Sequence, residues 1–128
     1  MAVRIVRLGS ARGRGEGLRI GTVRRPPRGV PKAEFAKRDY YDVWLPELAP
    51  SAELVATGLT AAGAKEWAAF EKRYRKEMST PIALRLLDLL AALSRSTALA
   101  VGCYCETERR CHRSILRELL TERGAVIA

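Results

Sequence analysis

The fold is decided by residues 97–103, Thr97-Ala98-Leu99-Ala100-Val101-Gly102-Cys103. After its first residue this stretch does not alternate polar and apolar side chains, which is typical of a strand buried on both faces in a parallel sheet. A helix is predicted to begin near Cys111 or His112 and to end at Gly124. Its buried stripe is predicted to contain Ile115, Leu116, Leu119 and Leu120. We therefore expect an α/β fold with residues 97–103 as the central strand.

Two further helices are predicted upstream of this strand. Residues 64–78 repeat large apolar side chains at spacings of three and four, as an amphipathic helix does. Those side chains are Trp67, Phe70, Tyr74 and Met78. Ser79-Thr80-Pro81 supplies a cap and a proline at a first helical position, so a second helix through Ile82, Leu86, Leu90 and Leu93 is expected. The two helices are expected to form a hairpin, and Ser51 to cap a short helix through residues 54–56.

The remaining strands are predicted in the first third and at the end of the chain. Residues 3–8 and 18–23 approach the alternation of a strand with one buried face. The intervening Gly-rich segment reads as a flexible loop. Residues 40–45 form an edge strand or an irregular segment, and residues 125–127 are a candidate for a last short strand.

These elements predict a single small layered domain over residues 1–128, with a short, mostly parallel sheet flanked by helices. Residues 1–17 are expected to be its flexible or edge-strand start.

The chain has 128 residues and a net charge of +9, which is concentrated in its first third. Residues 1–40 hold 11 Arg and Lys against 3 acidic residues, a balance of +8, whereas residues 97–128 hold 5 against 4. The same third is rich in Gly and Pro, so we expect loops that present Arg24 and Arg28 to a phosphate or carboxylate. A general compositional preference for Arg explains the same counts without a ligand.

Composition also excludes some classes of protein. With 48% hydrophobic residues the chain is not a disordered tail. It has no run of about 20 apolar residues for a membrane span and no long apolar segment of a secretory signal near its start. We expect a cytoplasmic protein without membrane association.

The 3 Cys and the single His of the chain all lie between residues 103 and 112. This segment leaves the carboxyl end of the predicted central strand and enters the last helix, where ligands bind in open α/β sheets. An odd number of cysteines argues against a disulfide framework and for thiol chemistry, metal binding or packing.

Two interpretations of this segment use its cysteines as ligands or as a nucleophile. Cys103, Cys105, Cys111 and His112 are acceptable zinc ligands, although adjacent residues at a helix start do not easily face one ion and no C-x2-C pair is present. Cys103 and Arg109 satisfy the Cys-x5-Arg spacing of phosphatase-like or rhodanese-like loops. The residues between them include two acids and no glycine, which does not suit an anion cradle.

Two more interpretations concern the helix start. Free N–H groups at Cys111, His112 and Ser114 stabilise a thiolate or a phosphate, with Arg113 as a bidentate clamp. Alternatively, Cys103 and Cys111 are small core residues, His112 is a hydrogen-bonded linker, and Arg113 pairs with Glu106 or Glu108. All four interpretations stay open at this point.

The sequence resembles the DUF488 family, including its YeaO-like branch, over nearly all of the chain after residue 17. Cys103 and Cys111-His112-Arg113 match the family's Cys followed eight residues later by Cys-His-Arg. A segment typical of the YeaO-like branch also resembles this sequence, and the residues that agree with it are Gly17, Arg19, Arg24, Pro27, Arg28 and Gly29. Further matches are Asp42, Trp44, Leu45, Glu47, Leu48, Ala49, Pro50, Ser51, Glu53 and Leu54, followed by Trp67, Phe70, Tyr74 and Glu77.

Val23 and Pro26 depart from the branch, which has Asp and Trp there. The resemblance implies a compact α/β domain and places the Arg24/Arg28 loop and the Cys-His-Arg helix start among recurrent features. It supplies no activity.

The leading functional hypothesis is a pocket for a phosphate-bearing small molecule or a nucleic-acid phosphate. Arg24, Arg28, Arg113 and Ser114 would bind it. In an enzymatic version Cys111 or Cys103 is the nucleophile and His112 transfers the proton. The alternatives are a non-catalytic, sequence-neutral nucleic-acid-binding module and the Cys/His metal site. No cofactor is predicted.

Overall fold

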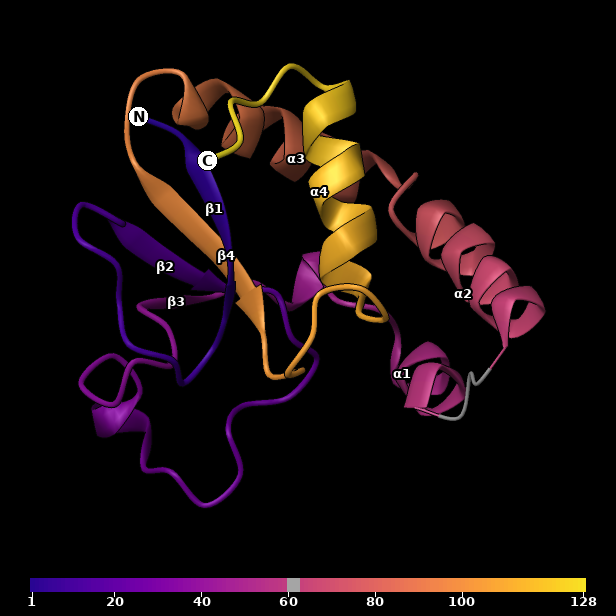
Figure 1. The fold of residues 1–128 in the computed structure, drawn as a ribbon, viewed down its shortest axis with the longest axis horizontal. Helices are drawn as coiled ribbons and strands as arrows, with labels where there is room; N and C mark the ends of the chain where they lie inside the picture. Colours follow the sequence, from indigo (N-terminus) through magenta and orange to yellow (C-terminus); the bar gives the residue numbers. More distant parts are fainter. Residues whose placement is uncertain (60–62) are drawn as a thin grey trace.

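Four strands form one parallel sheet in the order β1-β4-β2-β3 in the computed structural model, which describes residues 1–59 and 63–128 (Figure 1). The strands are β1 (Val3–Arg7), β2 (Leu18–Gly21), β3 (Val43–Trp44) and β4 (Leu99–Cys103). β4 pairs with β1 on one side and β2 on the other, and all of its residues are buried. The prediction of a central strand buried on both faces is therefore confirmed.

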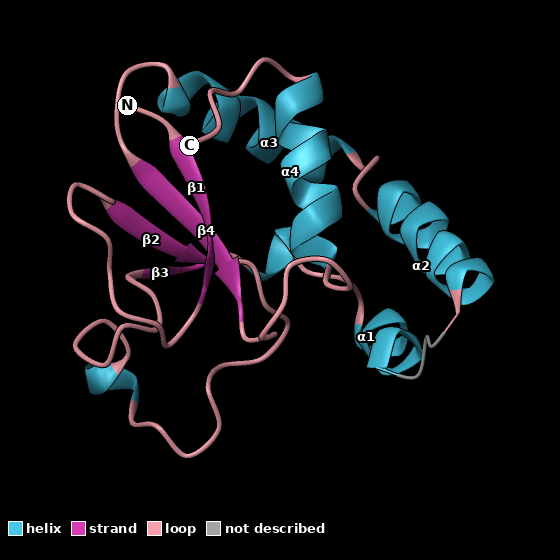
Figure 2. Cartoon of the chain, viewed as in Figure 1, coloured by secondary structure: helices cyan, strands magenta, loops and turns pink. Residues whose placement is uncertain are grey.

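Helices follow the predicted order and complete an α/β fold (Figure 2). They are α1 (Ala52–Leu59), α2 (Ala64–Glu77), α3 (Pro81–Ser94) and α4 (His112–Glu122), with short 3-10 turns η1 (Lys32–Glu34) and η2 (Pro46–Leu48). Figure 1 shows α3 and α4 on one side of the view and the long N-terminal loops on the other. The fold class predicted from the sequence is confirmed.

The predicted helix caps are present. Ser51 Oγ accepts a hydrogen bond from Leu54 N, and Thr80 Oγ accepts one from Ala83 N, each at 3.3 Å. Gly124 has a φ of +86° just beyond α4, a conformation that favours glycine and ends the helix. These local signals give correct helix ends because they depend only on neighbouring residues.

Three details of the prediction are wrong. The helices of residues 64–78 and 81–93 do not form a hairpin: in the described part of the chain α2 lies mainly against α1 and α4, and α3 against α4. Residues 125–127 form no strand but a single bridge, between Val3 and Ile127. The polar position of β2, Arg19, does not face solvent but is fully buried.

No helix among the described residues is long and apolar enough to span a bilayer.

The buried Arg19 side chain is part of an ion pair that holds the loops beside β2. Its Nε donates to Glu16 at 2.8 Å and its Nη2 at 2.9 Å, a bidentate arrangement, and its Nη1 donates to the carbonyls of Ser10 and Asp39. Asp42 accepts from the Arg19 main-chain N and from Arg12. The alternation in β2 therefore marks an internal ion pair and not a solvent-facing surface.

Apolar side chains form two clusters. The larger joins the sheet to all four helices and includes Leu54, Tyr74, Leu87 and Leu116. The smaller, at the carboxyl ends of the strands, contains Leu8, Val23, Tyr41, Cys103 and Cys111. The cysteines thus lie where the sheet ends and α4 begins.

Candidate thiol and histidine site

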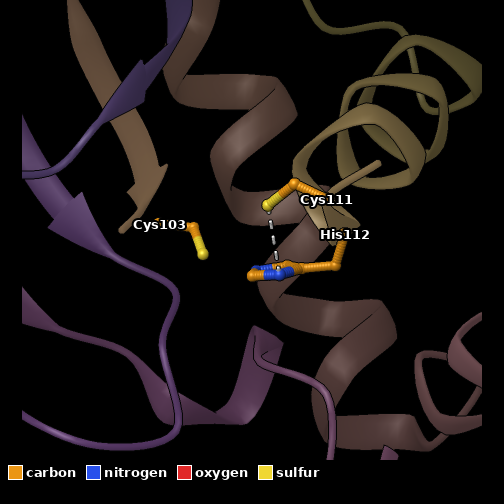
Figure 3. A group of neighbouring side chains, drawn as sticks. All are labelled: Cys103, Cys111 and His112. Carbon is orange, nitrogen blue, oxygen red and sulfur yellow. Dashed lines mark hydrogen bonds between the residues drawn. The ribbon is translucent and has the colours of Figure 1, made fainter. Parts of the chain in front are cut away.

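Three side chains with sulfur or nitrogen atoms that can act as nucleophiles or metal ligands converge between β4 and α4 (Figure 3). Cys103 is the last residue of β4, Cys111 is the N-cap of α4, and His112 is its first residue. All three are buried, and their Sγ and ring nitrogen atoms lie within 4.8 Å of one another. The structure therefore brings together the three residues that the sequence nominated for catalysis.

Cys111 and His112 face the same point although they are adjacent in the sequence. Cys111 has extended backbone angles, φ −128° and ψ 149°, so its side chain is not yet on the helical spiral. Its Sγ lies 3.8 Å from His112 Nδ1 and accepts a hydrogen bond from Arg113 N at 3.5 Å. The expectation that adjacent residues at this helix start do not easily face one ion is wrong here, because the N-cap is not helical.

One hydrogen bond fixes the proton on the His112 ring. Nε2 lies 2.8 Å from the main-chain oxygen of Thr22, which can only accept, so Nε2 carries the hydrogen. In the neutral ring Nδ1 then has a free lone pair, and this is the atom that faces Cys111. The Tyr74 ring packs edge-on against the imidazole, with ring centroids 5.5 Å apart. The imidazole is held with its basic nitrogen toward the thiols.

The thiols also interact with one another. Cys103 donates its S–H to Cys105 Sγ at 3.8 Å. Hydrogen bonds with Cys105 and Cys111, together with burial, raise the pKa of Cys103. The hydrogen bond from Cys103 lowers the pKa of Cys111, and the neighbouring His112 contributes in the same direction. Cys105, which is exposed, has its pKa lowered by the same donor. Cys103 is thus the protonated member of the cluster, and Cys105 and Cys111 are the candidate thiolates.

Arg113 is a buried cation that has no carboxylate partner among residues 1–59 and 63–128, which the structure describes. The residue is 3% exposed and its Nη2 donates to the Cys105 carbonyl at 2.7 Å. Its buried Nε has no hydrogen-bond partner in the described part of the chain. The predicted pairing with Glu106 or Glu108 is wrong, because Glu108 pairs with Arg117 instead. A buried guanidinium is costly unless an opposite charge is near. After the hydrogen bonds from the neighbouring cysteines, its charge also lowers the pKa of Cys105, which favours a thiolate at that residue.

A pocket of about 380 Å³ opens onto this cluster. Cys103, Cys105, Cys111 and His112 form its thiol and imidazole side. Its apolar walls include Val23, Pro50, Val55, Ala56 and Phe70. Arg24, Arg25 and Arg110 also line it, and none of its described lining residues is acidic. This composition suits a ligand with an apolar body and an anionic group.

The two nominated loop arginines lie in different places. Arg24 lines the thiol pocket, with its Nε and Nη2 donating to the carbonyls of Pro50 and Ala49. Arg28 instead lines a second hollow of about 440 Å³. The prediction that both arginines serve one pocket at the helix start is therefore wrong for Arg28, because the chain from Arg25 through Pro26 and Pro27 to Arg28 runs along the other hollow.

Other nominated residues are not on the pocket wall. Ser114 uses its Oγ to bond the Cys111 carbonyl, and the Arg113 guanidinium is turned toward Cys105. Arg109 is exposed and does not line the pocket, so Cys103 and Arg109 do not form a Cys-x5-Arg anion site there. Arg110 lines the pocket instead, and its guanidinium lies over the Trp67 ring. Arg25 and Tyr104 line the pocket without having been nominated. The only signal for Tyr104 was its place directly after the central strand.

The protein is a small α/β domain with thiols and an imidazole at the carboxyl end of its central parallel strand. The chain belongs to the DUF488 family: the family model described as the active DUF488-N3 subclade matches residues 3–124. Membership of the YeaO-like branch stays a prediction. Neither the curated proteins nor the solved structures include a match to this chain.

Proposed function

We propose that this protein binds a phosphate-bearing ligand in the thiol pocket and acts on it through the Cys111 thiolate. The observation that carries the proposal is the His112 ring, whose Nε2 bond to Thr22 leaves Nδ1 facing Cys111 Sγ at 3.8 Å. A thiol beside a free imidazole nitrogen and at a helix N-terminus is activated as a nucleophile. The description of the matched family as an active subclade agrees with an enzymatic role.

The proposed chemical step is a group transfer to sulfur. His112 Nδ1 accepts the Cys111 proton, and the sulfur electron pair forms a bond to an electrophilic atom of the ligand. The bond to the leaving group breaks with its electrons, and the imidazolium returns the proton to that group. Cys103 and Arg113 act as positioning residues, because the S–H donor and the buried cation both favour thiolates in the cluster.

Ligand binding rests on the composition of the pocket. Arg24 retains donors beyond its two carbonyl bonds, and Arg25 and Arg110 add positive charge at the rim without a nearby acid among the described lining residues. The apolar walls suit the non-phosphate part of the ligand, as in a nucleotide.

Thiol alkylation tests this function. Iodoacetamide labelling of each cysteine is followed by mass mapping against pH, with and without AMP or inorganic phosphate. We expect Cys111 to react at lower pH than a free cysteine, AMP to slow the reaction, and His112→Gln to remove the low-pH reactivity. Arg85→Ala is the matched control, because Arg85 is exposed on α3 and does not line the pocket. Ordinary reactivity at Cys111 that no anion affects would overturn the proposal.

A zinc centre is the second candidate function. The Sγ atoms of Cys103 and Cys111 and a ring nitrogen of His112 lie within 4.8 Å of one another, and three protein ligands with one open position are typical of catalytic zinc. Cys105 Sγ lies 3.8 Å from Cys103 Sγ but is not part of this three-residue group. Elemental analysis after purification without added metal distinguishes the candidates: about one zinc per chain, lost in Cys103→Ser, supports a metal centre, and its absence supports the free thiols.

A further inference from the structure

We infer that the ligand of the thiol pocket is a single-stranded nucleic acid, whose backbone lies in the second hollow while one nucleotide occupies the thiol pocket. This inference rests on the proposed function, because it names the substrate class of the same site. It is carried by the second hollow, which is lined by Arg7, Leu8, Arg25, Pro26, Pro27, Arg28, Tyr40 and Tyr104.

The two hollows adjoin. Arg25 and Tyr104 line both of them, and the Tyr104 hydroxyl donates to the Arg25 carbonyl at 2.8 Å, which ties the loop after β2 to the loop after β4. A ligand that crosses this shared wall contacts both hollows at once. Their volumes of about 380 and 440 Å³ are each in the range of a small-molecule site, so together they accommodate more than one nucleotide unit.

The second hollow carries uncompensated positive charge. Arg7, Arg25 and Arg28 are exposed, and within the described part of the chain none of their guanidinium groups has a carboxylate partner. By contrast, Arg12 pairs with Asp42 and Arg75 with Glu122. No described lining residue of either hollow is acidic. Repeated guanidinium groups along a groove fit the repeated phosphates of a polymer better than the phosphate of one small molecule.

Two tyrosines supply surfaces for bases. Tyr40 and Tyr104 are half-buried, with ring centroids 6.2 Å apart in an edge arrangement. Aromatic side chains beside a basic groove bind single strands because unpaired bases can stack on them. The chain contains neither Asn nor Gln, the usual bidentate partners of adenine, so the contacts are expected to be sequence-neutral. A duplex keeps its bases stacked inside, and it is therefore the weaker ligand.

Binding of fluorescein-labelled DNA and RNA single strands of about 12 nucleotides tests the inference by anisotropy over a range of KCl concentrations. We expect binding that weakens with salt, with a slope reduced by about 0.7 in Arg28→Ala and largely retained in Arg28→Lys. Arg85→Ala is the matched control, because Arg85 is exposed on α3, which lines neither hollow. Circular dichroism and thermal melting verify that each variant is folded.

A second measurement tests whether one strand occupies both hollows at the same time. The unlabelled strand is added to the alkylation assay, where it is expected to protect Cys105 and Cys111 at lower concentration than AMP. Protection by AMP without binding of the strand overturns this inference and leaves the proposed function standing. Binding of the strand without thiol protection, or binding of a duplex as tight as that of the strand, also overturns it. Loss of protection by both AMP and the strand rejects the two proposals together.

Discussion

The Nε2 atom of His112 lies 2.8 Å from the main-chain oxygen of Thr22, and this contact decides which ring nitrogen faces Cys111. The acceptor is a carbonyl on the segment that follows β2, 90 residues away in the sequence. No side-chain substitution at position 22 removes that oxygen. The orientation of the His112 imidazole therefore depends on the pairing of β2 with β4, beside which the Thr22 N–H also bonds the Gly102 carbonyl.

The hydrogen bond from Cys103 is predicted to control the acidity of its neighbours. In Cys103→Ala the thiols of Cys105 and Cys111 lose the donor that lowers their pKa values. Their alkylation midpoints should move upward by about 0.7 pH unit, the equivalent of one hydrogen bond of about 1 kcal/mol. Cys103→Ser keeps an O–H donor and should move them less. Equal profiles in the wild type and Cys103→Ala would contradict this role.

Arg113 is predicted to act on Cys105 through its charge. Because the guanidinium lowers the pKa of Cys105, Arg113→Met should raise the pH at which Cys105 reacts. Arg113→Lys keeps the charge and should leave Cys105 closer to the wild type. Mass-mapped alkylation rates against pH measure the effect. A shift of the same size in both variants would indicate a packing effect and not a charge effect.

The buried pair of Glu16 and Arg19 is predicted to stabilise the fold strongly. Glu16→Gln leaves the Arg19 charge without its partner and should lower the free energy of unfolding by about 3 kcal/mol. Urea denaturation measures this. Replacing both residues, as in Glu16→Gln with Arg19→Met, should cost less than the single change at Glu16. A larger loss in the double variant would contradict the account.

The Glu16–Arg19 pair also makes the free energy of unfolding depend on pH. Burial alone would raise the pKa of Glu16, but the hydrogen bonds from Arg19 and from Gly13 N outweigh it, so this pKa lies below the ordinary 4.5. The contribution is complete above pH 4.5 and is lost as the pH falls through the lowered value. Unfolding measured between neutral and acidic pH should show a steeper loss in the wild type than in Glu16→Gln. Parallel curves would exclude Glu16 as the titrating group.

Tyr74 is predicted to stabilise the core through its hydroxyl. The group is buried and donates to the Leu48 carbonyl at 2.7 Å. Tyr74→Phe leaves that carbonyl without this donor and should cost about 1 to 2 kcal/mol of unfolding free energy. Tyr40→Phe, at a half-buried tyrosine, serves as the stability control and should change the melting temperature little. Equal stability of the Tyr74 variant and the wild type would contradict the prediction.

The sequence alone predicts a strand or a helix end correctly where neighbouring residues determine it. The unbroken apolar run of residues 97–103 and the cap at Thr80 depend on local chemistry, and both were predicted correctly. The convergence of Cys103 with His112 followed from the strand-to-helix connection. Whether Cys111 also faced the site depended on its backbone angles, which spacing alone does not provide.

Other features depend on the path of the whole chain. Arg19 looked like a solvent-facing position because alternation does not distinguish water from a buried carboxylate such as Glu16. Arg24 and Arg28 are four residues apart, yet they line different hollows because the intervening prolines redirect the backbone. Strand order, which places the loop after β2 beside the loop after β4, was likewise beyond pattern analysis.

The Sγ atom of Cys111 is the proposed nucleophile and also caps α4. As the cap, it accepts the Arg113 N–H. Alkylation, oxidation or metal coordination at that sulfur changes the acceptor seen by this amide. In an NMR spectrum the Arg113 amide resonance should therefore shift with each chemical state of Cys111. A single backbone signal thus offers a label-free measure of the chemical state of the Cys111 thiol.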